Sequence, residues 1–201
     1  MNSGAPDQAT ARPVWQGHLP GEIGVWLFIG GDLIVFSVLF AAFMNTRAHQ
    51  LPVFAAGRAQ LNQVCGLINT LLMVSSSWCV VRAVKAARSQ RRQVAQAFFG
   101  AALACGIGFW IVKCFEYTEK LAAGLTVSTN DFFMMYFVYT GVHLLHVTVG
   151  MGVLTALIFY VRSGEFDAIK LRNIESGASF WHLVDILWIV LFPLLYLLPT
   201  P

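Results

Sequence analysis

Long apolar runs alternate with short polar connections along this chain. Spanning the hydrocarbon core of a bilayer as a helix takes about 20 residues. Five runs qualify: Ile23 to Met44, Val64 to Val81, Val94 to Val112, Phe132 to Val161 and Ser176 to Leu198. The fourth run exceeds one bilayer thickness, so we expect it to tilt or project. Segments of about ten alternating residues, typical of outer-membrane strands, do not occur. The pattern predicts an all-α polytopic membrane protein, with a polar tail over residues 1–20 and one five-helix domain over residues 21–201.

Composition agrees with a membrane protein. Hydrophobic residues make up 57% of the 201 positions and charged residues only 11%, whereas a soluble domain carries about 25% charged residues. No basic patch with interleaved aromatic residues points to nucleic acid. The four cysteines lie in or beside apolar runs without CxxC spacing, so we interpret them as small buried residues and not as disulfide or metal ligands: Cys65, Cys79, Cys105 and Cys114.

Basic residues are distributed unevenly between the two sides of the predicted spans. One side carries Arg12, Arg82, Lys85, Arg88, Arg91, Arg92, Arg162, Lys170 and Arg172. The other side carries Arg47, Arg58 and Lys120. Because cytoplasmic loops are enriched in Lys and Arg, this asymmetry predicts a cytoplasmic N-terminus and a periplasmic C-terminus.

A few ionisable residues interrupt the apolar runs, where they are costly and therefore informative. Asp32 lies about 14 Å into the first span at 1.5 Å per residue. It is either a proton-exchanging or partner-contacting acid, or a neutral side chain bonded within the bundle. His143 and His146 are three residues apart in the fourth span, as are His182 and Asp185 in the fifth, so each pair shares a helix face.

Depth places Asp32, His146, His182 and Asp185 in the same half of the membrane, so these groups are expected to form one polar layer with His143. The histidines admit satisfied packing, a functional polar network between helices, or a metal or haem pair. Metal binding would require further ligands in matching geometry, and the spacing does not demand them.

Charged residues also flank the end of the third span. Lys113 and Glu116 are three residues apart, and Glu116 precedes Lys120 by four, both favourable spacings on a helix. We expect them, with Glu119, to form an outer rim of charges at the membrane interface. In the same span Gly100, Ala104 and Gly108 recur every four residues, which predicts a face for close helix packing. Pro193 is expected to kink the last span.

The chain lacks a nucleophile–base constellation, a phosphate-binding glycine loop and a zinc-type cluster. From its residues alone it is a five-helix membrane bundle with sparse polar groups and no recognisable enzyme site.

Several stretches resemble subunit III of the haem–copper oxidases. The resemblance rests on Gly24 to Asp32, Leu67 to Leu72 with Ser75 to Ser77, Phe115-Glu116-Tyr117, Thr140-Gly141-Val142-His143-Leu144-Leu145-His146-Val147, and Trp181-His182-Leu183-Val184-Asp185-Ile186-Leu187-Trp188. The five-helix length is similar to the short form of that family. That short form includes subunit III of bacterial quinol oxidases and the NorE-type protein encoded with bacterial nitric oxide reductase. Residues 129–137 leading into Leu144-Leu145-His146, with residues 192–196, favour the NorE type.

The resemblance implies a non-catalytic subunit of a bacterial inner-membrane oxidoreductase that reduces oxygen, or nitric oxide for the NorE type. Haem and copper would belong to the partner, catalytic subunit I. This chain would bind no redox cofactor, hold phospholipid in a cleft, and support assembly, stability and proton uptake. Asp32 occupies the position where the family usually has Glu, so the reactivity of that family position toward carbodiimides is not expected to carry over unchanged.

Two alternatives remain open at this point. The chain is an independent membrane haem protein that uses His143 or His146 with His182, in which case the purified chain shows a b-type Soret band. Or it is a small proton channel or transporter, in which case liposome flux disappears in Asp32→Asn. Transporters often carry internal repeats and broken helices, and no convincing repeat is visible.

Overall fold

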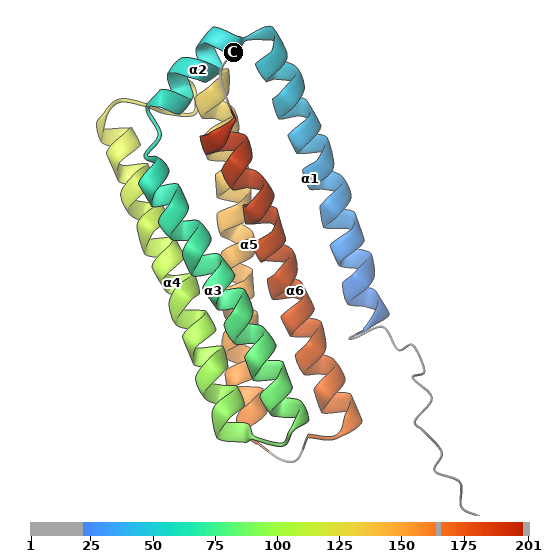
Figure 1. The fold of residues 1–201 in the computed structure, drawn as a ribbon. Coiled ribbons are helices and arrows are strands. Elements are labelled where there is room, and N and C mark those ends of the chain that lie inside the picture. The colour runs from blue at the N-terminus through green and yellow to red at the C-terminus, as the bar shows by residue number, and fades with distance from the viewer. Residues whose placement is uncertain (1–21, 164–165, 199–201) are drawn as a thin grey trace, which may run out of the picture.

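A computed structural model describes residues 22–163 and 166–198, which form helices and the connections between them (Figure 1). The helices are α1 Ile23–His49, α2 Leu51–Ala59, α3 Gln63–Arg88, α4 Arg92–Ala122, α5 Asp131–Arg162 and α6 Ala168–Phe192, followed by a π-helical turn η1 Pro193–Leu197. The predicted tail over residues 1–20, including Arg12, lies outside the described residues.

The five predicted spans are confirmed. In each case the helix is longer than the apolar run that predicted it. By length and composition, five helices of the described chain can cross a membrane. α4 continues ten residues past the end of its apolar run at Val112, because Lys113 to Ala122 keep helical spacing with charged side chains. α6 starts at Ala168, where the Asp167 carboxylate accepts a hydrogen bond from the backbone N–H of Lys170.

α2 was not predicted, because its nine residues are too few to span a membrane. Pro52 stands in its first turn, where a missing N–H costs nothing. The helix lies across one end of the bundle (Figure 1). There Gly57 approaches the Phe132 ring of α5 so closely that a methyl group would overlap it. Asn62 and Asn130 then cap α3 and α5 by accepting hydrogen bonds from backbone N–H groups.

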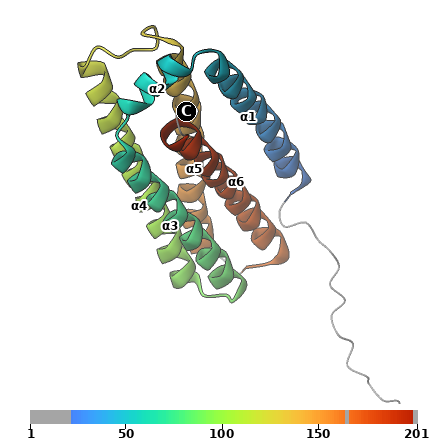
Figure 2. The ribbon, with the colours of Figure 1, turned by 45° about the horizontal axis from the view of Figure 1, so that its top comes forward.

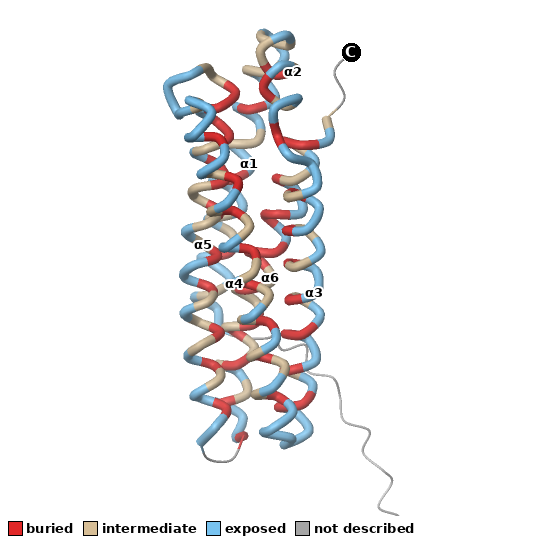
Figure 3. Tube along the Cα trace, turned by 90° about the vertical axis from the view of Figure 1, so that its left-hand side faces the viewer, coloured by how far each residue is buried: buried red, intermediate tan, exposed pale blue. Residues whose placement is uncertain are grey.

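Helices α3 to α6 form a four-helix core, and α1 stands at its side. The most extensive helix contacts are those of α3 with α4, α4 with α5, and α6 with α3 and α5. α1 packs only on α2, α5 and α6 among the more extensive contacts, and it stands apart from α3 and α4 in two views (Figures 1 and 2). Buried residues follow the inward side of the core helices (Figure 3).

Of the packing face predicted for α4, only Gly108 lies close to a neighbouring helix, where a methyl group would meet Leu72 of α3 at 3.4 Å. A methyl group at Gly100 would meet no neighbouring atom within 4 Å, and Ala104 is exposed. The buried face instead carries Ala102 and Gly106, where the Trp181 ring and Met151 leave little room for a side chain. Small residues recur on both faces of this helix, so their spacing alone does not indicate which face packs.

Pro193 marks the point where α6 changes to the π-helical turn η1, in agreement with the kink expected there. This turn directs Leu195 and Tyr196 into the core, where both side chains are buried. The end of η1 lies at the same end of the bundle as α2, and the start of α1 lies at the opposite end with the α3–α4 turn (Figure 1).

Candidate functional site

The ionisable residues predicted within the spans form two separate pairs. On α1 and α5, Asp32 Oδ2 lies 3.1 Å from His146 Nε2. On α6, His182 Nδ1 lies 3.6 Å from Asp185 Oδ2. No hydrogen bond or ion pair joins the two pairs within residues 22–163 and 166–198.

The Asp32–His146 pair must share a proton. His146 Nδ1 lies 2.8 Å from the Val142 carbonyl oxygen, which can only accept, so Nδ1 carries a hydrogen. Nε2 therefore either is protonated beside an ionised Asp32, or accepts a hydrogen from a neutral Asp32. In both cases one proton lies between Nε2 and Oδ2. The pair thus ties α1 to α5 by a hydrogen bond, and the Phe36 ring packs edge-on against the imidazole.

The second pair belongs to a polar contact between α3 and α6. His182 Nδ1 lies 2.8 Å from Ser77 Oγ, a shorter contact than the one to Asp185. The His182 side chain is 32% exposed, while Asp185 is almost fully buried behind it. His182 lines a cleft of about 200 Å³ between α3 and α6, whose other polar walls are Lys85, Arg88, Glu175 and Ser179.

His143 contacts neither pair. Its ring stacks on Trp188 at 5.3 Å between centroids and meets the Phe109 ring at 5.5 Å. It is fully buried, and neither ring nitrogen has a hydrogen-bond partner among the described residues. The expected single layer of five residues is therefore divided into two pairs and one enclosed histidine.

The largest polar cluster lies in the core between α4, α5 and η1. Lys113 Nζ donates to Glu116 Oε2 at 2.9 Å, to Tyr196 OH at 3.1 Å and to Tyr136 OH at 3.4 Å. The Tyr196 hydroxyl donates in turn to Glu116 Oε1 at 2.6 Å. All three ammonium hydrogens and both carboxylate oxygens are thus bonded, as a buried ion pair requires.

Aromatic rings complete the surroundings of this ammonium group. Lys113 Nζ lies 5.0 Å from the Tyr136 centroid and 5.2 Å from the Trp188 centroid, within the range of cation–π attraction. The neighbouring Tyr117 hydroxyl lies 2.6 Å from Thr140 Oγ1, which also bonds the Tyr136 carbonyl. We call Lys113, Glu116, Tyr136 and Tyr196 the lysine network.

Lys113 and Glu116 were expected to form an exposed outer rim, and this prediction is wrong. Their side chains are fully buried, whereas Glu119 is 59% exposed beside Lys120. The apolar run ends at Val112, but the helix and the bundle continue well beyond it. The sequence carried one signal for this burial. Tyr136 near the start of the fourth span and Tyr196 near the end of the fifth lie on the same side of the membrane as Lys113 at the end of the third.

Sequence reasoning also missed the hydrogen bonds that hold α6 to α3. The Trp181 indole donates to Ser76 Oγ at 3.0 Å, and the Trp188 indole donates to Thr70 Oγ1 at 3.0 Å. Together with the Ser77–His182 contact, they join one face of α6 to one face of α3. The serine run and Thr70 were visible in the sequence, but their partners depend on the register between the two helices.

Among the described residues, no group of three or more His, Cys, Asp or Glu side chains is arranged to hold a metal ion. The four cysteines carry free thiols.

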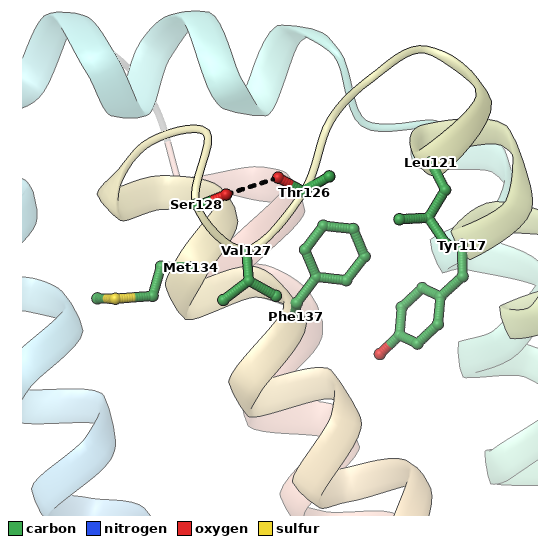
Figure 4. A pocket seen from close by; sticks show the side chains of 7 residues that line it. All are labelled: Tyr117, Leu121, Thr126, Val127, Ser128, Met134 and Phe137. Carbon is green, nitrogen blue, oxygen red and sulfur yellow. Dashed lines mark hydrogen bonds between the residues drawn. The ribbon is translucent and has the colours of Figure 1, made fainter.

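A larger cavity of about 450 Å³ lies near the α4–α5 connection, away from the ionisable residues of α6 (Figure 4). Its walls are mainly apolar, with Leu121, Val127, Met134 and Phe137 around it. Thr126 and Ser128 bond to each other at its edge, and the Tyr117 hydroxyl is already bonded to Thr140. The cavity therefore offers apolar surface but few free polar groups.

Comparisons with known proteins cover nearly the whole chain. The sequence model of a family described as "Cytochrome c oxidase subunit III" matches residues 13–199. "Cytochrome c oxidase subunit 3" of Synechocystis sp. is 33% identical over 176 residues, which cover 87% of this chain and 74% of that protein. "Quinol oxidase subunit 3" of Bacillus subtilis is 27% identical, with 88% and 86% of the two chains covered.

A third relative joins two subunit types in one chain. "Heme-copper oxidase subunit I+III" of Aeropyrum pernix is 27% identical over 179 residues. The matched region covers 86% of this chain but only 22% of that protein.

Proposed function

The chain belongs to the cytochrome c oxidase subunit III family, and from this premise we propose that it is a non-catalytic subunit of a haem–copper terminal oxidase. Its role is to pack beside the catalytic subunit and to support the assembly, stability and proton uptake of the complex. The haem and copper that reduce oxygen belong to that partner.

The observation that carries this proposal is the inward packing of the polar face of α6. Trp181, His182 and Trp188 each contact a hydroxyl group of α3. A polar side chain that already bonds a neighbouring helix stabilises the bundle, since few free groups are left to bind a substrate. The polar side chains of α6 therefore support a structural role.

The names of the relatives support the identity of the partner. The relative from Aeropyrum pernix is named as a fusion of subunits I and III, which favours a direct contact between the two types of subunit. The relatives from Synechocystis and Bacillus are named as cytochrome c and quinol oxidase subunits, which favours oxygen as the substrate of the complex. Nitric oxide, expected for a NorE-type protein, stays a prediction that the identity of the partner decides.

We propose a bacterial inner-membrane location with the N-terminus in the cytoplasm. The α3–α4 turn and the start of α6 lie at the same end of the bundle as the start of α1 (Figure 1). Basic residues gather at this end, among them Arg88, Arg91 and Arg172, and the positive-inside rule assigns such an end to the cytoplasm.

The geometry disfavours the alternative of an independent haem protein. His143 is enclosed by Trp188 and Phe109, and a haem ligand would need both rings to move. His182 bonds Ser77, and His146 bonds Val142 and Asp32.

Co-purification tests the proposal. A tagged copy of the chain is expressed in its native membrane, solubilised gently and captured under conditions that retain known oxidase complexes. We expect a haem–copper catalytic subunit to be captured with it, and the haem spectrum to be assigned to that subunit. Recovery of the chain without any such partner, or with stoichiometric haem of its own, would contradict the proposal.

A further inference from the structure

Three buried polar side chains, one each from α3, α5 and α6, carry nitrogen or oxygen atoms that make no hydrogen bond, although Asp185 Oδ2 lies 3.6 Å from His182 Nδ1. Among residues 22–163 and 166–198, the buried side-chain nitrogen and oxygen atoms that lack a hydrogen bond all belong to Asn69, His143 and Asp185. These residues come from three different helices, and all are at most 2% exposed. Buried polar groups in proteins are bonded almost without exception, so such atoms call for a partner.

Two of the three side chains flank one residue, Trp188, and the third lies at its level on α3. The His143 ring stacks on the Trp188 ring, and Asp185 lies one helical turn before Trp188 on the same face. Asn69 is fully buried beside Thr70, whose hydroxyl accepts the hydrogen bond from the Trp188 indole. The three residues therefore lie within about one helical turn of the level of Trp188.

Polar groups that already have partners lie on both sides of these three residues along the bundle. Toward the α3–α4 turn, Asp185 lies behind His182, which lines the cleft between α3 and α6. In the other direction the Trp188 ring covers the Lys113 ammonium at 5.2 Å. The cluster thus occupies the interval between a cleft with polar walls and the lysine network.

We propose that the core binds internal water molecules at Asn69, His143 and Asp185, which join these residues into a hydrogen-bonded file open to the cleft beside His182. A buried water makes about three hydrogen bonds to otherwise unpaired polar groups. The cluster offers the required mixture of donors and acceptors, because an amide supplies both, an imidazole supplies one of each, and a carboxylate accepts. The aromatic contacts of His143 do not bond its ring nitrogens, so water is expected at those atoms.

The arrangement gives the file a function beyond that of a packing subunit. A chain of bonded waters from His182 through Asp185 to His143 allows protons to exchange between the cleft and the interior of the bundle. The lysine network closes the far side, because the hydrogens of its ammonium group are already engaged. The file is thus a blind, proton-exchanging inlet and not a channel across the membrane.

Water-edited solid-state NMR of the full chain in phospholipid bilayers tests this inference. The experiment measures magnetisation transfer from water protons to side-chain nitrogens, and His143→Phe assigns the His143 signals. The Trp181 indole nitrogen is the internal control, since it is equally buried but bonded to Ser76. We expect transfer to His143 to be several-fold faster than transfer to Trp181.

Three variants sharpen the result. Asn69→Leu replaces a polar group with an apolar one of similar size and is expected to lower transfer to His143 several-fold. Leu154→Met, at a buried apolar position of α5 about three turns beyond His143, is the control and is expected to leave it unchanged. Asp185→Asn keeps a polar group of the same shape, so transfer from water to His143 should be preserved in it. This variant provides a second measurement if Asn69→Leu does not fold.

Two outcomes would overturn the proposal. One is transfer to His143 no faster than transfer to Trp181. The other is a direct hydrogen bond between His143 and Asn69, reported by the nitrogen chemical shifts of His143. Such shifts would stay the same in Asp185→Asn.

Discussion

The lysine network and the Asp32–His146 pair are both ionisable contacts within apolar helices, but their surroundings differ. Lys113 and Glu116 are fully buried, and two tyrosine hydroxyls bond them. The side chains of Asp32 and His146 remain about 16% exposed and join the peripheral helix α1 to α5. The first contact lies inside the four-helix core and the second at the attachment of a fifth helix.

This difference indicates what each contact stabilises. Removing one partner of a buried ion pair leaves an uncompensated charge in a medium of low dielectric constant. Removing a partner of the Asp32–His146 pair breaks one hydrogen bond at the edge of the bundle and leaves no ion buried in the four-helix core. We therefore expect mutations in the lysine network to unfold the core, and mutations in the Asp32–His146 pair to loosen α1 alone.

The largest effect is expected for Glu116→Gln. The variant keeps the shape of the side chain but leaves the buried Lys113 ammonium without an anionic partner, which costs about 3–5 kcal/mol of unfolding free energy. Denaturant titration in detergent micelles, followed by tryptophan fluorescence, measures this change. The double variant Lys113→Met with Glu116→Gln should recover much of the loss, because no charge then remains buried. A single variant as stable as the wild type would show that the pair is not enclosed.

Close packing of the core gives the second comparison. A methyl group at Gly150 would lie 2.6 Å from the Trp181 ring, whereas one at Gly30 of α1 would meet no atom within 4 Å. We expect Gly150→Ala to lower the unfolding free energy by about 1–3 kcal/mol, the usual cost of overpacking. Gly30→Ala should be neutral in the same titration. Equal effects of the two substitutions would remove the distinction between a dense core and a loosely attached helix.

A smaller effect is expected for Asp32→Leu. It removes the partner of His146 Nε2 and should weaken the attachment of α1 to α5 by about 1 kcal/mol, the typical contribution of one hydrogen bond. Spin labels on α1 and α5 would report a broader distance distribution, while the denaturation midpoint of the core stays nearly constant. Asp32→Asn serves as the control, because an amide can still donate to Nε2. A core destabilised as strongly as in Glu116→Gln would contradict this assignment.

The smallest effect is expected for Arg88→Ala at the mouth of the cleft. Arg88 Nη2 lies 2.7 Å from Glu175 Oε1, but the arginine side chain is 55% exposed. Pairs of this kind contribute about 1 kcal/mol or less and are screened by salt. Titrations at low and high salt should show a difference that shrinks as the salt concentration rises. A loss that is large and independent of salt would place this pair in the core.

The sequence allowed the five spans and the separation of residues in each pair to be predicted, because hydropathy and helical spacing are local properties. The Asp32–His146 contact was anticipated only as part of a common layer. Its separation from Asp185 arises because His146 of α5 faces α1, whereas the His182–Asp185 pair of α6 lies beside Ser77 of α3, a placement that no local pattern encodes.

The end of the apolar run at Val112 made Lys113 resemble an interfacial charge. The tyrosines near the ends of other spans hinted at partners, but only the structure shows that the hydroxyls of Tyr136 and Tyr196 bond Lys113. The contact of Tyr196 with Lys113 depends on the π-helical turn that continues α6 from Pro193. Proline signalled a kink but not its direction. The bonds of Trp181 and Trp188 to α3 likewise depend on the register of two helices that are far apart in the sequence.

If this chain is a structural subunit, the redox chemistry belongs entirely to its partner. To test this directly, the oxidase complex is purified from cells that lack this chain, and its haem content and first turnovers of oxygen reduction are measured. We predict an unchanged haem content and initial turnover, followed by faster loss of activity than in the complete complex. Loss of haem in proportion to the missing chain would contradict the claim.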